Sequence, residues 1–548
     1  MTTCKIANGK KLGTAEKIPP GSSREQWPML PVESAQANLS GSSDPQSGLS
    51  VAGHNPPEAR GNSWRPSFLW RIADSSVFGL WLAVVIFTLA HHEKWADEAQ
   101  AWLIARDLPL RAIWFHELRY EGSPGLWHTI LWIAQHVFHA PYATLGAIGV
   151  ACAAAGAAFV LWKAPFPRPL RYLLIFSYFL LYQYAVVARS YVLFPLFAFM
   201  AADAYKDRHH PERITLAFVL LSLLCLHGAL FSASLGLVFL VEATREWRSF
   251  DAALRRRFVI CALLLGAVFL FAFAILKPSS DVDAFVKPAP SQHIWEAAKS
   301  TKLVSVISGA LLDFTLPSMI FLGMAAAWCF TRRQGLAFLL PTAALIFLYV
   351  FIHGQSHHHG TVFVAVIAGL WIAWPTAEEQ RCESAAERRA NRLMMVLLGI
   401  LCAVNIWDAT VSVRYEYLYP YSGAEDAAQY LRSVDATKSL VFGYTYGAAA
   451  VNAYFDHNVF GNLPNSYYHH GSDAKGAFID LPELQRRQPE FLVFLTGSPA
   501  REIPELDPVL RSYGYEMVHF SDGYLFFKRS LMDRQVYVVY QLLAGIRA

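Results

Sequence analysis

The stretch VFGLWLAVVIFTLAHHEKWADEAQAW at residues 77–102 joins an apolar run to a polar segment in which two tryptophans flank an adjacent acid pair. The apolar half has the composition of a helix that crosses a membrane. The polar half places Asp97 and Glu98 directly after it. These groups are either solvated residues at the lipid headgroups, with Trp95 and Trp102 as aromatic anchors, or carboxylates of a catalytic site at the membrane surface.

The composition is that of a membrane protein. Only 16% of the 548 residues are charged and 54% are hydrophobic, whereas soluble domains carry about 25% charged residues. The net charge of +4 gives no indication of nucleic-acid binding. The apolar residues gather in runs of roughly the length that crosses a bilayer. We count about eleven, at 74–90, 141–162, 171–187, 190–205, 214–227, 228–243, 258–276, 315–331, 336–352, 360–375 and 393–410.

Residues 1–66 are rich in Ser, Gly, Pro and Asn and show no apolar periodicity. We therefore predict a disordered cytoplasmic tail. The tail lacks the apolar core of a signal peptide, so the first span is expected to remain as an anchor.

Basic connections predict the orientation of the spans, because Lys and Arg gather on the cytoplasmic side of a membrane. With these connections inside, eleven spans and a cytoplasmic N-terminus place the C-terminus outside. The segment 123–140 must then begin and end on the outer side, as an interfacial or re-entrant helix would. If this segment crosses the membrane instead, the bounds of two neighbouring spans must be changed. The basic connections are 163–171, 206–213, 245–257, 331–333 and 381–392.

The remaining connections, on the predicted outer side, hold the unusual polar residues. They are the loop 91–122, the turns 188–191 and 226–228, the loop 277–314 and the turn 353–360. The charge bias and the clustering of these residues are separate observations, and both select the same face.

After residue 410 the long apolar runs stop. Ser422 and Glu425 have the spacing of a capping box, which predicts a helix over 424–434. Further on, the sequence predicts two buried strands and a hairpin, at 439–444, 490–497 and 514–529.

The predicted fold is a polytopic α-helical membrane protein with a C-terminal extracytoplasmic α/β domain. The membrane part, of about eleven spans, covers 67–410 and includes the outer loop 91–122. The α/β domain covers 411–548.

Several outer side chains are candidates for chemistry. In a helix, Trp95 and Trp102 share a face, which leaves the acid pair for the other side, where a carboxylate can act as a general base. Arg189 lies between two apolar runs, where an arginine is costly unless it is paired or faces a polar cavity. Arg189 suits a phosphate ligand, because a guanidinium can bind a phosphate with two nitrogens. In the alternative interpretation, its side chain extends to the lipid headgroups.

Three further positions have a structural and a functional interpretation. Arg119 and Glu121 precede a Pro-Gly turn and form either a salt bridge within the loop or part of a site. His227, in LLCLHGALF, is either a hydrogen-bonded core histidine or a ligand contact.

The turn HGQSHHHG at 353–360 brings four histidines together. A cluster of imidazoles suits a metal, but no carboxylate accompanies them and three consecutive histidines cannot all point one way. Hydrogen bonds to a phosphate or a sugar fit equally well. The four residues are His353, His357, His358 and His359.

Together these motifs resemble the GT-C class of integral membrane glycosyltransferases, which includes protein O-mannosyltransferases and aminoarabinose transferases. The similarity is greatest to bacterial members with a PMT-like or RgtA/B/C/D-like core. It rests on the acid pair after the first span, the segment EGSPGLWHTILW at 121–132, the Ala-Arg-Ser-Tyr turn at 188–191 and the terminal outer domain. The second motif departs from the family, because Gly122 and Ser123 precede Pro124 where His-Pro-Pro is usual.

The resemblance implies transfer of a sugar from a polyprenyl-phosphate donor to a lipid, glycan or protein acceptor on the outer face of the plasma (inner) membrane. By resemblance, Asp97 would deprotonate or orient the acceptor hydroxyl, and Glu98 would hold the acceptor or a metal. The donor phosphate would contact Arg189, Tyr191 and His357. Acceptor or donor contacts would come from Arg119, Glu121, His227 and His353. No cofactor is certain, and a divalent metal stays open.

Two other functions use the same features. A transporter or flippase of a lipid-linked or anionic substrate would place the arginine and histidines along a passage, although such proteins often show paired internal repeats that this sequence lacks. A non-catalytic assembly protein of the envelope would use only the outer domain to bind partners.

Overall fold

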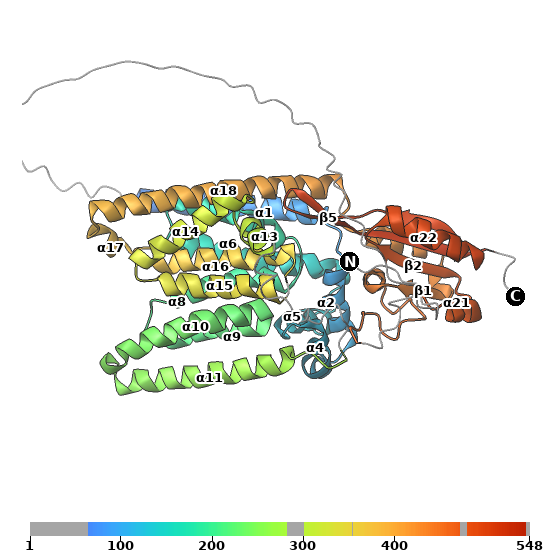
Figure 1. Cartoon of the computed structure of the whole chain (residues 1–548), viewed down its shortest axis with the longest axis horizontal. Helices are drawn as coiled ribbons and strands as arrows, with labels where there is room; N and C mark the ends of the chain where they lie inside the picture. Colours follow the sequence, from blue (N-terminus) through green and yellow to red (C-terminus); the bar gives the residue numbers. More distant parts are fainter. Residues whose placement is uncertain (1–63, 282–300, 353, 472–478, 544–548) are drawn as a thin grey trace, which may run out of the picture. The chain divides into compact units, whose positions relative to one another are not determined.

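The described residues are mostly helical, and among them a β-sheet region occurs only near the C-terminal end (Figure 1). This computed structural model describes residues 64–281, 301–352, 354–471 and 479–543. Residues 1–63 of the predicted tail, and His353, lie outside the described residues. The described residues from Ala73 onward form one compact unit.

Most of the predicted apolar runs contain a helix, and further helices lie between them. The helices before the C-terminal region are α1 (Trp64–Leu89), α2 (Ala96–Asp107), α3 (Leu110–Ala112), α4 (Leu118–Glu121), α5 (Leu126–His136), α6 (Leu145–Lys163), α7 (Arg168–Ile175), α8 (Phe194–Ala204), α9 (Pro211–Leu224), α10 (Leu226–Glu246), α11 (Ala252–Leu276), α13 (Thr301–Ala310), α14 (Thr315–Thr331), α15 (Gly335–Phe351), α16 (Gly360–Ala373), α17 (Ala377–Arg381) and α18 (Ala385–Leu418).

The chain is a multi-pass membrane protein, but the count of eleven spans is not confirmed. Among the described residues, five helices are long and apolar enough to cross a membrane, or six if the pair α13–α14, bent by 71°, is one span. Several other runs form helices too short for a bilayer, since a crossing needs about 20 residues. Examples are α9, of 14 residues, and α16, also of 14 residues.

Two predicted segments take a different form. The run 171–187 is not one helix: α7 ends at Ile175, and a π-helical segment, Phe179–Gln183, follows after a turn. The segment 123–140 contains α5, whose 11 residues are too few to cross a bilayer. It packs against α2, which agrees with the interfacial or re-entrant alternative.

Helix α16 lies at the centre of the helical packing, with every one of its residues buried. It packs against both α15 and α8. A helix that is apolar all round is expected to be enclosed by other helices. Its first residue, Gly360, leaves no space for a Cβ, which would lie 2.4 Å from Phe179 and 2.6 Å from the Tyr184 hydroxyl. The turn before α16 is therefore held tightly against its neighbours.

The C-terminal region is a small mixed sheet with helices on both faces. Its helices are α19 (Ala424–Ser433), α20 (Ala449–Asn452), α21 (Leu481–Arg487) and α22 (Pro499–Ser512); its strands are β1 (Val441–Tyr444), β2 (Phe491–Thr496), β3 (Tyr515–Ser521), β4 (Tyr524–Phe527), β5 (Ser530–Arg534) and β6 (Val536–Leu542). The order in the sheet is β1-β2-β6-β3, with β4 and β5 paired separately. Strands β1 and β2 are parallel, and β6 is antiparallel to β2 and β3.

The two predicted strands are confirmed as β1 and β2, but two other details are wrong. Helix α19 has Gly423 as its N-cap and no side-chain cap, because the Ser422 hydroxyl accepts from Ala424 N instead. The segment 514–529 is not a hairpin: β3 pairs with β6, and β4 pairs with β5. The strand β6, from further along the chain, takes the place next to β3.

Helix α2 shares a hydrophobic core with one face of the sheet. Ala99 and Leu103 belong to the same buried cluster as Val441, Val493 and Val539 of β1, β2 and β6. Neighbouring strand residues, such as Phe442 and Leu492, lie in a separate cluster on the other face, as the alternation of a strand requires. The outer loop that carries the acid pair is therefore packed against the C-terminal region.

A buried charge cluster also joins the C-terminal region to the helices. Lys528 and Arg529, at the turn between β4 and β5, both pair with Asp313 and with Asp408. Asp408 belongs to α18 and is fully buried. Breaking such a pair would leave a buried charge uncompensated, which is strongly destabilising. The β4–β5 turn is thus fixed to the turn after α13 and to the interior of α18.

Candidate functional site

The first residues of α2, α10 and α16 and the turn before α8 meet around one set of polar side chains. Asp97 is the second residue of α2, and His227 is the second residue of α10. His357 lies in the 3₁₀ turn Ser356–His358 that precedes α16, and Arg189 precedes the 3₁₀ segment that leads into α8. The N-terminal end of a helix carries partial positive charge and favours a bound anion.

Asp97 and Arg189 are in direct contact. The distance from Arg189 Nη2 to Asp97 Oδ2 is 3.0 Å, and the two side chains are only 20% and 23% exposed. The other carboxylate oxygen of Asp97 accepts a hydrogen bond of 2.8 Å from the hydroxyl of Tyr446. The structure thus brings together the two residues that the sequence singled out separately, 92 positions apart in the chain.

The guanidinium of Arg189 is enclosed by aromatic rings. Its central carbon lies 5.6 Å from the ring centre of Trp95 and 5.5 Å from that of Tyr191, which fits cation–π contact. Its Nη1 atom is buried and has no hydrogen-bond partner among the described residues. A buried donor without a partner is costly, and a guanidinium with one nitrogen held and one free can still bind an oxyanion.

Histidines and tyrosines continue the site from Arg189. The Tyr191 hydroxyl and His227 Nδ1 are 3.1 Å apart. The His227 and His358 rings are 4.9 Å apart, and those of His357 and Trp95 are 6.0 Å apart. Tyr191, His227 and His357 therefore lie together, and His358 joins them. His359 points elsewhere, toward Phe527.

Glu98 has a different environment from its neighbour. It is 0% exposed, and its oxygens accept from Ala188 N at 2.7 Å and Trp95 N at 3.2 Å. Although burial acts to raise the pKa of Glu98, its pairing with His92 lowers it overall. The side chain fastens the turn 188–191 to α2. This geometry corrects the expectation that Glu98 holds the acceptor or a metal, since its oxygens are already engaged.

His92 joins Glu98 to the end of α18. Its Nε2 is 3.0 Å from Glu98 Oε2 and its Nδ1 is 2.8 Å from Glu416 Oε1, which also accepts from the Tyr182 hydroxyl at 2.6 Å. Burial lowers the pKa of His92, but the two carboxylates outweigh burial and raise it to about 10. His92 is therefore a buried imidazolium between two acids.

The variant His92→Gln is expected to show how this network depends on pH. Because its pKa is raised in the folded state, His92 contributes stability that is fully present below its ordinary value of 6.5 and is lost as the pH approaches about 10. The difference in unfolding free energy between wild type and variant should be on the order of a few kcal/mol near neutral pH, and should shrink toward alkaline pH. The measurement is thermal unfolding of both proteins in detergent from neutral pH to pH about 10. A difference in unfolding free energy that stayed constant over this range would show that His92 is not an imidazolium.

Arg119 and Glu121 have different environments. Arg119 is exposed on α4, while Glu121 is partly buried and accepts from Gln100 Nε2 at 2.9 Å. Burial, then Glu117 and Asp97 as neighbouring acids, raise the pKa of Glu121 to about 8, against the opposing hydrogen bond from Gln100. Glu121 thus lies on the acidic side of the site, and the loop salt bridge is not formed.

Tyr446 and Glu416 are the contacts that sequence reasoning missed. Tyr446 begins a 3₁₀ turn shortly after β1, and Glu416 lies in the last turn of α18, past the end of the last predicted apolar run. Neither belongs to a recognisable motif. The sequence offered only weak signals for them: a charged residue just after a span, and a tyrosine just after a buried strand. Both features are common at positions with a purely structural role.

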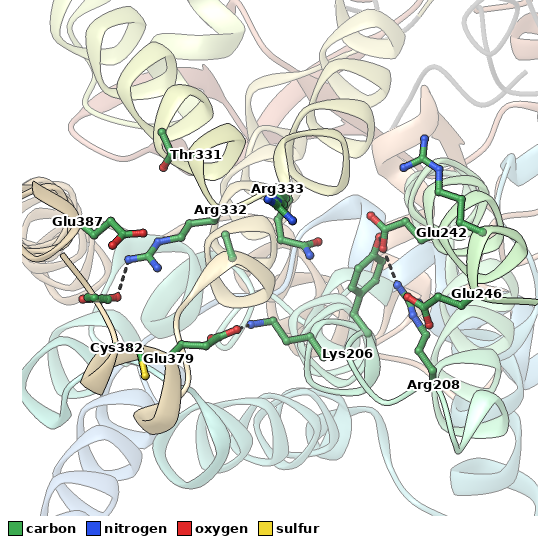
Figure 2. A pocket seen from close by; sticks show the side chains of 15 residues that line it. Lys206, Arg208, Glu242, Glu246, Thr331, Arg332, Arg333, Glu379, Cys382 and Glu387 are labelled. Atoms are coloured by element: carbon green, nitrogen blue, oxygen red, sulfur yellow. Dashed lines mark hydrogen bonds and ion pairs between the residues drawn. The ribbon is translucent and has the colours of Figure 1, made fainter. Parts of the chain in front are cut away.

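A large cavity lies at the opposite ends of the same helices. Its volume is about 800 Å³, and it is lined by residues near the C-terminal ends of α8, α10, α14 and α16 (Figure 2). Many of its charges are paired with one another: Arg208 with Glu242 at 2.5 Å and Arg332 with Glu383 at 2.6 Å. The basic connections predicted to be cytoplasmic therefore lie at one end of the helices, and the candidate site lies at the other.

Within the part of the chain that the structure describes, no group of three or more His, Cys, Asp or Glu side chains is arranged to hold a metal ion. The rings of His227 and His358 both lie against the ring of Tyr191. Their arrangement suits hydrogen bonds to a phosphate or a hydroxyl.

No protein-family model matches this chain, and no curated protein matches it. Among solved structures, the chain is similar to the crystal structure of ArnT from Cupriavidus metallidurans bound to undecaprenyl phosphate. The sequence identity is 12% and the TM-score is 0.43, over 89% of this chain and 99% of that chain.

Proposed function

We propose that the chain is a GT-C-type membrane glycosyltransferase that moves a sugar from a polyprenyl-phosphate donor to an acceptor on the outer face of the plasma membrane. The observation that carries the proposal is the contact of Asp97 with Arg189 at 3.0 Å, beside a guanidinium nitrogen that is buried and unpartnered among the described residues. A base and a phosphate-binding cation side by side are the two groups that such a transfer needs.

The donor phosphate would bind at Arg189. The free Nη1 atom, the Tyr191 hydroxyl and the neighbouring His227 and His358 supply donors for its oxygens. The N-terminal ends of α10 and α16 add partial positive charge. As the donor breaks, negative charge grows on the phosphate, and a fixed cation in a site that excludes water stabilises it far better than a solvated one does.

The acceptor would be activated by Asp97. The acceptor oxygen forms a bond to the anomeric carbon, and the bond from that carbon to the phosphate oxygen breaks, with its electron pair staying on the phosphate. The proton of the acceptor hydroxyl passes to Asp97. Because Asp97 and Arg189 touch, they must part if they are to flank a sugar from opposite faces. A phosphate that takes over the guanidinium would release the carboxylate for this role.

The orientation is tested by cysteine labelling in intact cells. His116 lies in the outer loop with its side chain 71% exposed, and Cys382 is exposed beside the large cavity at the other helix ends (Figure 2). In a chain that keeps only Cys382 and adds His116→Cys, a membrane-impermeant maleimide should label position 116 in intact cells. Position 382 should react only after permeabilisation. The reverse result would place the site in the cytoplasm and contradict an outer-face transferase.

The function is tested by mass analysis of envelope glycans and of lipid-linked sugars, with and without this protein. A transferase predicts one missing sugar on an envelope molecule, and accumulation of the unused donor on the outer side of the membrane. Accumulation on the cytoplasmic side would instead indicate a transporter or flippase. An unchanged set of glycans would reject transfer.

A further inference from the structure

A small cavity lies between the start of α2 and the C-terminal region, next to the candidate site. Its volume is about 170 Å³. Trp95 lines it from the α2 side, and Thr445, Tyr446, Arg501, Asp533 and Gln535 line it from the C-terminal region. Tyr446 is the residue whose hydroxyl donates to Asp97. One tyrosine therefore separates this cavity from the proposed base.

Three of the residues that line the cavity each carry a buried polar atom with no hydrogen-bond partner among the described residues. The atoms are Thr445 Oγ1, Gln535 Oε1 and Trp95 Nε1. Thr445 is 3% exposed and Gln535 is 7% exposed. A buried polar atom without a partner costs stability and calls for an explanation. Here one atom donates, one accepts and one hydroxyl does both, which is the complement of a molecule with several hydroxyl groups.

The backbone at this wall is also held in an unusual form. Thr445 has φ +70° and ψ +162°, a region that is essentially reserved for glycine and that persists only when the surroundings enforce it. Two residues on, Gly447 packs so closely on Leu495 that a Cβ would overlap the leucine side chain. Strain of this kind gathers at binding sites, and here it holds the Thr445 hydroxyl at the cavity.

The charges of the cavity disfavour an anionic ligand. Arg501 contributes one positive charge, whereas Glu502 and Asp533 contribute two negative ones. Arg189, the proposed phosphate ligand, does not line the cavity. Its size, below the range of about 300–1,000 Å³ typical of pockets that enclose a whole ligand, suits a single ring or the end of a larger molecule. Trp95 offers an aromatic face of the kind that packs against a sugar ring.

We propose that this cavity, which we call the hydroxyl pocket, binds a saccharide end of the acceptor and presents its hydroxyl to Asp97 past Tyr446. The inference rests on the proposed function and makes it more specific, because it identifies the acceptor as hydroxyl-rich and not anionic at the bound end. Trp95, Thr445 and Gln535 are then specificity-determining residues, whereas the donor phosphate stays with Arg189.

The test uses the full chain in nanodiscs with methyl α-D-glucopyranoside as the probe, followed by ligand-detected NMR. The glucoside should bind saturably. The variants Gln535→Leu and Thr445→Val, which keep the side-chain size, should weaken its binding at least tenfold. Gln429→Leu, at an exposed position of α19, is the matched control and should bind as wild type. Near-ultraviolet circular dichroism confirms that each variant is folded.

A second measurement separates this inference from the proposed function. In a transfer assay, Gln535→Leu and Thr445→Val should raise the acceptor KM at least tenfold and leave the donor KM unchanged. An unchanged acceptor KM in both variants overturns the hydroxyl pocket, even if Asp97→Asn abolishes transfer. Inorganic phosphate that displaces the glucoside also overturns it, since the pocket would then be an anion site. If the glucoside binds as described but Asp97→Asn keeps full transfer, the proposed function fails and the pocket stands.

Discussion

Asp97→Asn is expected to reduce sugar transfer by roughly 10²–10⁴-fold, the usual contribution of a positioned general base, while the protein still inserts into the membrane. Asparagine keeps the size of the side chain and can still meet the Tyr446 hydroxyl, but it cannot take up the acceptor proton. The measurement is the initial rate of transfer in membranes supplied with lipid-linked sugars from the native host. Binding of the donor should be nearly unchanged.

The matched control for this variant is Asp456→Asn, whose side chain is 96% exposed in the C-terminal region and which should transfer sugar as wild type does. If Asp97→Asn also turns over at the wild-type rate, Asp97 has no part in the chemistry. A loss of folded protein would be seen in the amount extracted by detergent, so it is distinguishable from a loss of rate.

Arg189→Ala is the second large effect, with an expected loss in transfer of about 10²–10³-fold, as for removal of one preorganised stabilising donor. The loss should fall on the donor, as a raised donor KM and a lower kcat, with the acceptor KM little changed. Arg189→Lys keeps the charge but not the two-nitrogen geometry, so it should recover only part of the activity. Titrations of the donor at a saturating acceptor concentration measure the separate changes in donor KM and kcat.

The exposed Arg111 of α3 gives the control, since Arg111→Ala removes the same side chain outside the site. An effect of Arg189→Ala confined to the acceptor would contradict the phosphate role. Because Asp97 and Arg189 touch, the double variant should lose less than the product of the two single losses. Independent losses would mean that the contact is not part of one functional unit.

The sequence predicted the helical architecture because apolar runs leave few alternatives in a membrane. The prediction failed for features that depend on the length of a helix or on which strands pair. The run 171–187 is broken into α7 and a π-helical segment, and several runs are too short to cross. The C-terminal sheet could be read only in part, since β6 pairs with both β2 and β3, and such distant pairings leave no local signal.

The chemistry of the site was predictable by residue type but not by environment. Asp97 and Glu98 are equivalent in the sequence, yet one meets Arg189 and the other is buried against Ala188 N. Helix periodicity does not distinguish them, because the difference comes from the turn 188–191 and from His92. Tyr446 lies 349 positions from Asp97, so its role could come only from the packing of α2 on the sheet.

The most direct test of the central claim is a single-turnover reaction of the purified chain in liposomes, with an isotopically labelled sugar on a polyprenyl phosphate and an envelope extract as acceptor. Wild type should release polyprenyl phosphate in step with the label appearing on the acceptor, and Asp97→Asn and Arg189→Ala should do neither. Wild type that leaves the labelled donor intact, or variants that match its rate, would contradict a transferase built on these two residues.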